Sequence, residues 1–129
     1  MKRFLFVSQL TSHAHLTRLA DVFRQVRAIA RLGGLTGLLV FDGDLFGHYL
    51  EGPAPALDAL MARIRSDDRH VNFVALLDEP WSGPRLFAQW SVGFAIDDEA
   101  KPLAQLAPLR GEAALQHFLA LSASLDKVT

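Results

Sequence analysis

Histidines and closely spaced charged residues are the side chains of this chain with the most evident chemistry. His13 and His15 stand two residues apart in a polar segment, whereas His48 lies in an apolar run. Two histidines with no third ligand nearby make a poor metal site, so we expect a solvated loop there and no metal. Because imidazole changes charge near neutral pH, His48 is either a proton acceptor in a pocket or a packed strand histidine bonded to the backbone.

Charged side chains recur at helical spacing in two places. Arg63 and Asp67 stand four residues apart, which suits either an ordinary helix ion pair or contacts to a bound ligand. Basic side chains also recur along a second stretch: Arg18, Arg24, Arg27 and Arg31. A phosphate or nucleotide would suit such a stripe, but the acid Asp21 beside it favours a solvated helix face.

Composition excludes several classes of protein. The chain has 129 residues, half of them apolar, a net charge of -1 and no cysteine. One domain with a hydrophobic core is expected, without disulfides or the basic excess of a nucleic-acid binder. No apolar stretch is long enough to cross a membrane, so we expect a cytoplasmic protein. No phosphate loop, nucleophile elbow or metal motif is present, so we do not expect an enzyme.

Hydrophobic periodicity predicts strands and helices in alternation. Strands are expected at 4–8, 35–41, 45–51, 71–77 and near 89–96, and amphipathic helices at 16–32 and 55–66. Gly33 and Gly34 should end the first helix. Asp42 and Gly43 should form a two-residue hairpin turn in which both positions tolerate positive φ.

This order of elements predicts an α+β, ferredoxin-like βαββαββ fold, with a mixed sheet and two helices on one face. The segment after Asp97 is rich in leucine, which predicts further helices on the other face of the sheet. We therefore divide the chain into a domain of residues 1–97 and a C-terminal helical extension of that domain, residues 98–129. The leucines of the extension form core, or present a helix to a partner protein.

Four spaced blocks of sequence resemble one family. They are Gly-Leu-Thr-Gly-Leu-Leu-Val-Phe-Asp-Gly at 34–43 with Tyr-Leu-Glu-Gly-Pro at 49–53, Ile-Arg-Ser-Asp-Asp-Arg-His at 64–70, and Phe-Ala-Gln-Trp-Ser-Val-Gly-Phe at 87–94. In order and spacing they are similar to BLUF domains, which are sensors of blue light using FAD. The similarity covers about residues 1–97. It implies a flavin, FAD or FMN, whose isoalloxazine ring lies between the two helices and faces the sheet.

The resemblance also implies a role for particular positions. The family's electron-donating tyrosine falls on Phe6, its glutamine on His48, and its asparagine on Ala30, next to Ile29. The family's Trp-Ser-Met becomes Trp90-Ser91-Val92. Only Arg63 and Asp67 keep the chemistry that the family has near its cofactor. The expected cofactor-binding positions are thus Phe6, Ile29, Ala30, His48, Arg63, Asp67, Trp90 and Val92.

These replacements predict that the usual Tyr/Gln photocycle is lost. Phe6 has no hydroxyl proton to give, and Tyr49, the single tyrosine, neighbours His48 on a strand and must point to the opposite face. Two hypotheses follow: a flavin-binding sensory module with altered photochemistry, or a cofactor-free module that acts through protein contacts. Its partner would be another protein or a second copy, bound through the sheet face or the C-terminal helices. Trp81, in a Pro/Gly loop, is either an interface anchor or loop packing.

Overall fold

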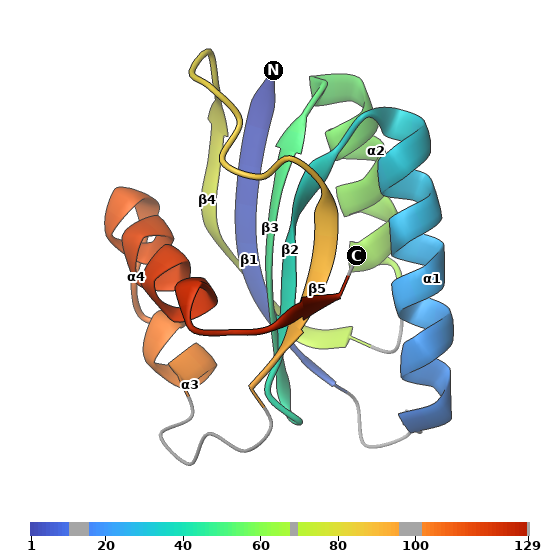
Figure 1. The fold of residues 1–129 in the computed structure, drawn as a ribbon, viewed down its shortest axis with the longest axis vertical. Coiled ribbons are helices and arrows are strands. Elements are labelled where there is room, and N and C mark those ends of the chain that lie inside the picture. Colours follow the sequence, from blue (N-terminus) through green and yellow to red (C-terminus); the bar gives the residue numbers. More distant parts are fainter. Residues whose placement is uncertain (11–15, 68–69, 96–101, 129) are drawn as a thin grey trace.

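The computed structural model describes residues 1–10, 16–67, 70–95 and 102–128 of the chain (Figure 1). Its elements follow one another in the order β1 (Lys2–Leu10), α1 (Leu16–Gly33), β2 (Thr36–Phe41), β3 (Leu45–Gly52), α2 (Ala54–Arg65), β4 (His70–Pro80), β5 (Trp90–Phe94), α3 (Pro102–Leu106), α4 (Gly111–Ala123) and β6 (Lys127–Val128). Each strand and helix predicted above is present. The short strand β6 was not predicted.

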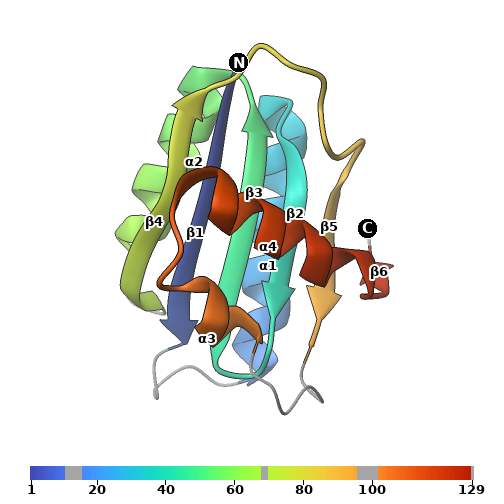
Figure 2. The same cartoon turned by 90° about the vertical axis from the view of Figure 1, so that its left-hand side faces the viewer.

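The strands form one mixed sheet in the spatial order β4-β1-β3-β2-β5-β6. All neighbouring pairs are antiparallel except β2 and β5, which run parallel. Strand β3 thus lies between β1 and β2, and β1 lies between β3 and β4. This is the split βαβ connection of a ferredoxin-like fold, as the order of elements predicted. The β4–β5 connection then crosses from one edge of the sheet to the other (Figure 2).

Helices cover both faces of the sheet. Helices α1 and α2 pack on one face, and α3 and α4 lie on the other, where α4 crosses the strands obliquely (Figures 1 and 2). The predicted C-terminal helices on the second face are therefore present. Their apolar side chains are core: Leu103, Leu106, Leu115 and Phe118 are buried.

Strand alternation divides the buried side chains into two cores. On the side of α1 and α2, the core includes Phe6, Phe46 and Leu50. On the side of α3 and α4, it includes Leu5 and Tyr49. Successive residues of one strand point to opposite faces, so the predicted parity of these strands is confirmed.

Two turns next to the site follow from local chemistry. Gly34 has φ +71°, and the amides of Leu35 and Gly34 donate to the carbonyls of Ala30 and Arg31 at 2.8 and 3.4 Å. This Schellman motif ends α1 where the paired glycines predicted. The β2–β3 turn differs from the prediction.

The two-residue turn is centred on Gly43 and Asp44, one residue later than expected. Asp42 precedes it, and its Oδ1 accepts hydrogen bonds from the amides of Asp44 and Leu45 at 2.9 and 2.7 Å. Only Gly43, with φ +99°, adopts a positive φ in this turn. The aspartate side chain therefore caps the turn, and a single left-handed residue suffices.

Candidate functional site

A row of side chains across the sheet forms the floor of the candidate site. The register pairs Phe6 of β1 with His48 of β3, His48 with Leu39 of β2, and Leu39 with Val92 of β5. All four lie on the side of α1 and α2 or within its core, and each is at least 97% buried. The Phe6 and His48 rings are 5.4 Å apart in an edge-to-face arrangement. The structure thus brings three predicted site residues, Phe6, His48 and Val92, into one line.

Trp90 joins this row by a hydrogen bond to His48. Its indole Nε1 donates to His48 Nε2 over 3.0 Å, and both side chains are buried, at 3% and 1% exposure. In the parallel register Trp90 lies opposite Gly37, which has no side chain. A Cβ at Gly37 would collide with the Tyr49 carbonyl of β3, so this position requires glycine. Because a protonated imidazole cannot accept a hydrogen bond, the contact with Trp90 requires His48 in its neutral form with the proton on Nδ1.

Helices α1 and α2 close over the row. The narrow space between them is lined by Val22, Gln25, Val26, Ile29, Leu60, Arg63, Ile64 and Asp67. Its volume is about 30 Å³, about that of one water molecule. Ala30, one residue after Ile29, is fully buried in the core beneath. Apolar side chains of the two helices therefore belong to the same buried cluster as Phe6.

Arg63 and Asp67 both line this interhelical cleft, although not both lie on the helix. Helix α2 ends at Arg65, with Ser66 as its C-cap, so Asp67 stands just beyond the end. Its amide donates to the carbonyl of Ile64 at 3.1 Å. Serine and aspartate bind nearby backbone groups in preference to continuing a helix, which explains why the prediction of a helix to residue 66 was slightly too long.

On the opposite face of β3, Tyr49 belongs to a second buried polar group. Its hydroxyl donates to Glu51 Oε1 at 3.0 Å, and the Glu51 carboxylate also accepts from the amides of Leu86 and Phe87 at 3.0 and 2.8 Å. Glu51 is fully buried. Burial, followed by the Glu51 charge, raises the pKa of Tyr49 above its ordinary 10.0. Glu51 thereby ties β3 to the segment that leads into Trp90.

Sequence reasoning missed two residues of this arrangement. Glu51 was noted only as part of a motif, because its amide partners lie 35 and 36 residues away. Phe73 of β4 stacks on Phe6 with ring centroids 4.5 Å apart. An aromatic residue at the middle of a predicted strand was the available signal for Phe73, but strand order is needed to place it beside β1.

The remaining predicted groups are distributed as follows. His13 and His15 lie outside the described residues, as does the side chain of Arg18. Trp81 packs in its loop: the Arg3 guanidinium lies 3.8 Å from its ring centroid, and its Nε1 donates to the Pro84 carbonyl at 3.0 Å. Arg24 forms an ion pair with Asp21, as expected for a solvated helix face.

Comparison with known proteins identifies the family. The family profile described as "BLUF: Sensors of blue-light using FAD" matches residues 1–93. This chain belongs to the BLUF family. BLUF domains are flavin-binding sensory modules for blue light rather than catalytic units, which agrees with the predicted function at this level. None of the helices in the described part of the chain is long and apolar enough to span a membrane.

Relatives of this BLUF domain include much longer proteins. The photoactivated adenylate cyclase subunit alpha-like protein FB of Euglena gracilis is 29% identical over 92 residues, which cover 70% of this chain and 9% of that protein. The solved structure of BlrB, a BLUF protein in its dark state, shares 29% identity and a TM-score of 0.66, covering 83% of this chain and 78% of BlrB. The BlsA ground state has 24% identity and a TM-score of 0.77 over 99% of this chain and 91% of BlsA, and shows the fold alone.

The residues of this BLUF domain do not fit an isoalloxazine ring in the arrangement described. Ligand pockets for molecules of that size measure about 300–1,000 Å³, whereas the interhelical cleft measures about 30 Å³. Ala30 and Val92 offer no hydrogen bond from their side chains, and His48 Nε2 already accepts one from Trp90. Among the residues that line the cleft, Gln25, Arg63 and Asp67 carry polar side chains that could contact a polar cofactor tail.

Proposed function

We propose that this chain is a BLUF module that works without the Tyr/Gln photocycle and without a bound flavin, and that regulates through protein contacts. The observation that carries the proposal is the hydrogen bond of Trp90 to His48 beneath the closed interhelical cleft. Protein side chains there satisfy one another, so the slot is part of the core. This favours the cofactor-free hypothesis over the flavin-binding one.

The position-by-position likeness to the family supports the loss of photochemistry. At the family's tyrosine, Phe6 has neither a transferable proton nor a readily oxidised ring. Tyr49 cannot replace it, because its ring lies in the core on the far side of the sheet. The position of the family's glutamine holds His48, whose Nε2 is engaged by Trp90. The Trp90 indole can be oxidised, but electron transfer from Trp90 would not be followed by the hydrogen-bond rearrangement of the family's glutamine.

Energetics support the closed slot as well. Opening the cleft for a ring would separate Ile29, Leu60 and their neighbours, and the bound ring would leave polar edge atoms without partners. Each unpaired buried polar group costs about 1–3 kcal/mol, which is about a ten- to hundredfold loss in affinity. Two such groups would move a micromolar flavin site beyond useful affinity.

Visible absorbance of the purified protein tests the proposal. We expect colourless protein, and no rise in thermal midpoint when FAD or FMN is added in excess, since only ligand that binds the native state stabilises it. BlrB, purified in parallel, is the reference BLUF protein. Yellow protein with stoichiometric flavin, or a saturable rise in midpoint with either flavin, would overturn the proposal and restore the flavin-binding hypothesis.

Protein contacts are the output that the relatives suggest. The matched segment is about a tenth of the length of the photoactivated adenylate cyclases, so a BLUF unit there stands beside much larger parts. We propose that this unit acts on a protein partner or a second copy. We also propose that residues 98–129 belong to the same domain as 1–97, because α3 and α4 supply one of the two cores.

A further inference from the structure

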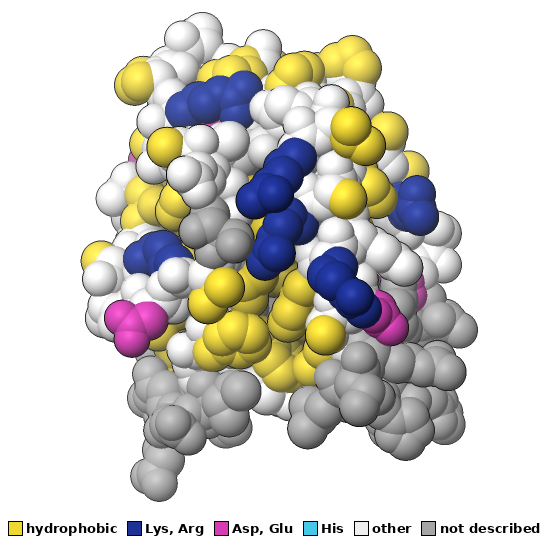
Figure 3. All heavy atoms as spheres, turned by 45° about the vertical axis from the view of Figure 1, so that its right-hand side comes forward, with side chains coloured by type: hydrophobic (Ala, Val, Ile, Leu, Met, Phe, Trp, Pro, Cys, Tyr) yellow, Lys and Arg dark blue, Asp and Glu magenta, His cyan; other side chains and the backbone are white. Residues whose placement is uncertain are grey.

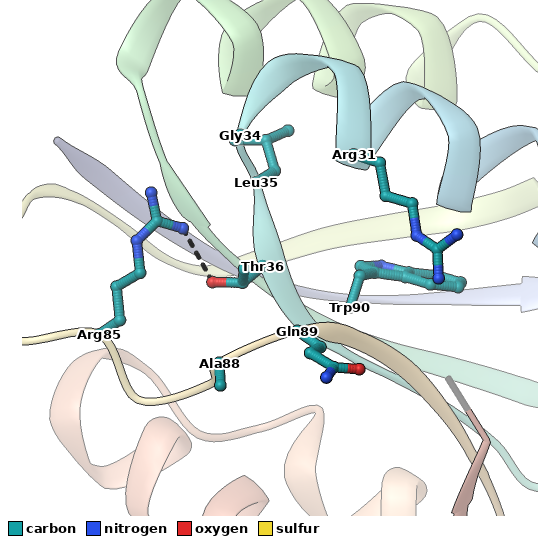
Figure 4. A pocket seen from close by; sticks show the side chains of 8 residues that line it. All are labelled: Arg31, Gly34, Leu35, Thr36, Arg85, Ala88, Gln89 and Trp90. Carbon is teal, nitrogen blue, oxygen red and sulfur yellow. Dashed lines mark hydrogen bonds between the residues drawn. The ribbon is translucent and has the colours of Figure 1, made fainter.

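A second, larger hollow lies at the C-terminal end of α1. It has a volume of about 510 Å³ and is open to solvent. The last turn of α1, the start of β2 and the β4–β5 connection form its walls (Figure 4). We call it the basic groove; it is lined by Arg31, Gly34, Leu35, Thr36, Arg85, Ala88, Gln89 and Trp90. It shares none of its lining residues with the interhelical cleft.

Two guanidinium groups flank the basic groove. Arg85 Nη1 donates to Thr36 Oγ1 at 2.9 Å and more weakly to the Glu51 carbonyl at 3.4 Å, which fixes this arginine against the wall (Figure 4). Arg31 projects from the other side and is exposed. Among the described residues, Arg31 has no hydrogen-bond or ion-pair partner. Its donors are therefore available to a ligand.

The acidic groups near the basic groove do not neutralise these arginines. No lining residue is acidic. Arg85 contacts Glu51 only through its backbone carbonyl, and the Glu51 carboxylate is fully buried and accepts hydrogen bonds from Tyr49 and two backbone amides. The C-terminal end of α1 also carries partial negative charge. Its Ala30 and Arg31 carbonyls, however, accept the amides of Leu35 and Gly34.

A second unpaired arginine lies one turn earlier on α1. Arg27 is four residues before Arg31, and its Nε is buried without a hydrogen-bond partner. Like charges at this spacing repel each other, so the arrangement costs stability in the free protein. Figure 3 shows several Lys and Arg side chains spread over this face of the molecule, with a few acidic side chains among them. Arg27 does not line the basic groove, but an anion bound to Arg31 there would reduce the repulsion between the two arginines.

We propose that the basic groove binds a small organic phosphomonoester, of the size of a sugar phosphate or a mononucleotide. A single arginine can pair with a carboxylate through two parallel hydrogen bonds. Two guanidinium groups from different elements instead match the dianionic charge and the three terminal oxygens of a phosphomonoester. The volume greatly exceeds that of a bare phosphate, so the ligand needs an organic body. Gln89 and Thr36 provide polar wall for sugar hydroxyls, and the Trp90 ring is too buried to stack on a base.

Ligand binding in the basic groove would affect the hydrogen bond between Trp90 and His48. The Gln89 carbonyl accepts the amide of Gly37 at 3.1 Å, and Trp90 is the next residue. Trp90 itself forms part of the groove wall and donates to His48. A ligand that joins Arg31 to Arg85 therefore fixes the segment that carries Trp90. This makes Trp90 fluorescence a reporter of occupancy.

Calorimetric titration of the full chain at low ionic strength tests the proposal. The probes are AMP and ribose phosphate, with adenosine and inorganic phosphate as comparisons. We expect at least one phosphomonoester to bind at least tenfold more tightly than adenosine and than inorganic phosphate. Arg31→Gln and Arg85→Gln should each weaken it about tenfold, the loss of one charge-assisted contact. On a Trp81→Phe background, Trp90 emission should change with the same saturation curve.

Arg24→Gln is the matched control, since it removes the same charge from the same helix at a residue paired with Asp21 outside the basic groove. Its affinity should stay within twofold of the parent. The proposal is overturned if neither phosphomonoester binds, if inorganic phosphate binds as tightly, or if Arg24→Gln weakens binding as much as Arg31→Gln. Because Arg31 is exposed, its variant should fold, and its thermal midpoint verifies this. Flavin absorbance does not enter, so failure here leaves the proposed function untouched.

Discussion

Replacing Trp90 by phenylalanine should lower the free energy of unfolding by about 2–4 kcal/mol. The phenyl ring has no hydrogen-bond donor, so the variant loses the 3.0 Å hydrogen bond from Trp90 Nε1 to His48 Nε2. Leaving a buried hydrogen-bond acceptor without a donor costs about 1–3 kcal/mol. The smaller ring also leaves a cavity in a position only 3% exposed, which adds roughly 1 kcal/mol. Urea unfolding, followed by far-UV circular dichroism, measures the change.

A double-mutant cycle isolates the hydrogen bond from the cavity. His48→Leu removes the acceptor, and the double variant Trp90→Phe with His48→Leu removes both partners. We expect a coupling free energy of about 1 kcal/mol in favour of the native pair. Trp81→Phe is the control, because the Trp81 hydrogen bond to Pro84 lies at the surface. It should change stability by less than about 1 kcal/mol and show no coupling to His48.

His48→Gln distinguishes hydrogen bonding from shape. A glutamine amide oxygen can accept the Trp90 proton, so this variant should retain most of the coupling that His48→Leu loses. A coupling below about 0.3 kcal/mol for the Trp90–His48 pair would refute the reasoning. The indole and the imidazole would then be packed side by side without a bond of consequence.

Three further changes test the opposite face. Glu51→Gln should cost about 2–4 kcal/mol in urea unfolding, because the amides of Leu86 and Phe87 donate to different carboxylate oxygens and a glutamine has only one acceptor oxygen. Glu112→Gln is the control: the Glu112 side chain is 64% exposed, so its loss should cost below about 1 kcal/mol. The pKa of Tyr49 is raised above 10.0, so the contribution of Tyr49 to stability is complete below pH 10. It falls as the pH rises further, by up to about 1.4 kcal/mol per pH unit. Tyr49→Phe should flatten this alkaline decline when unfolding is measured as a function of pH, and an unchanged decline would contradict the role given to Tyr49. Deleting residues 101–129 removes four large apolar side chains that are at most 1% exposed, Leu103, Leu106, Leu115 and Phe118, worth roughly 6–12 kcal/mol at 1.5–3 kcal/mol each. The truncated chain should show no cooperative thermal transition, whereas a folded one would mean that the tail only docks on a finished domain.

The parts of the fold that depend on local pattern could be predicted from the sequence. Period-two alternation placed Phe6 and His48 on one face and Tyr49 on the other, because a strand allows no other arrangement once one face is buried. The paired glycines marked the end of α1. The turn after Asp42 was displaced by one residue, since the hydrogen bonds of an aspartate side chain, rather than φ preference alone, fixed the register.

Contacts between distant segments could not be predicted in the same way. The Trp90–His48 bond spans 42 residues and exists because β5 returns to the edge of β2 after a crossover. The volume of the cleft between α1 and α2 depends on how closely the side chains of Ile29 and Leu60 fill it. Hydrophobic periodicity predicts which side chains face the core but not how closely they pack. The free guanidinium of Arg31 is a third case. The sequence favoured a solvated helix face, which agrees with the exposed Arg24 and Arg31, but it could not place Arg31 at the wall of the basic groove.

The two faces of β3 are connected through one segment of chain. His48 accepts a hydrogen bond from Trp90 on the side of α1 and α2, while Glu51 holds the amides of Leu86 and Phe87 from the other side. The residues between these anchors form one wall of the basic groove. A change at either anchor must therefore move or loosen the same few peptide groups, and side chains in one hydrogen-bonded network do not contribute additively. In the flavin-free module that we propose, this segment therefore connects the two cores through contacts within the protein alone.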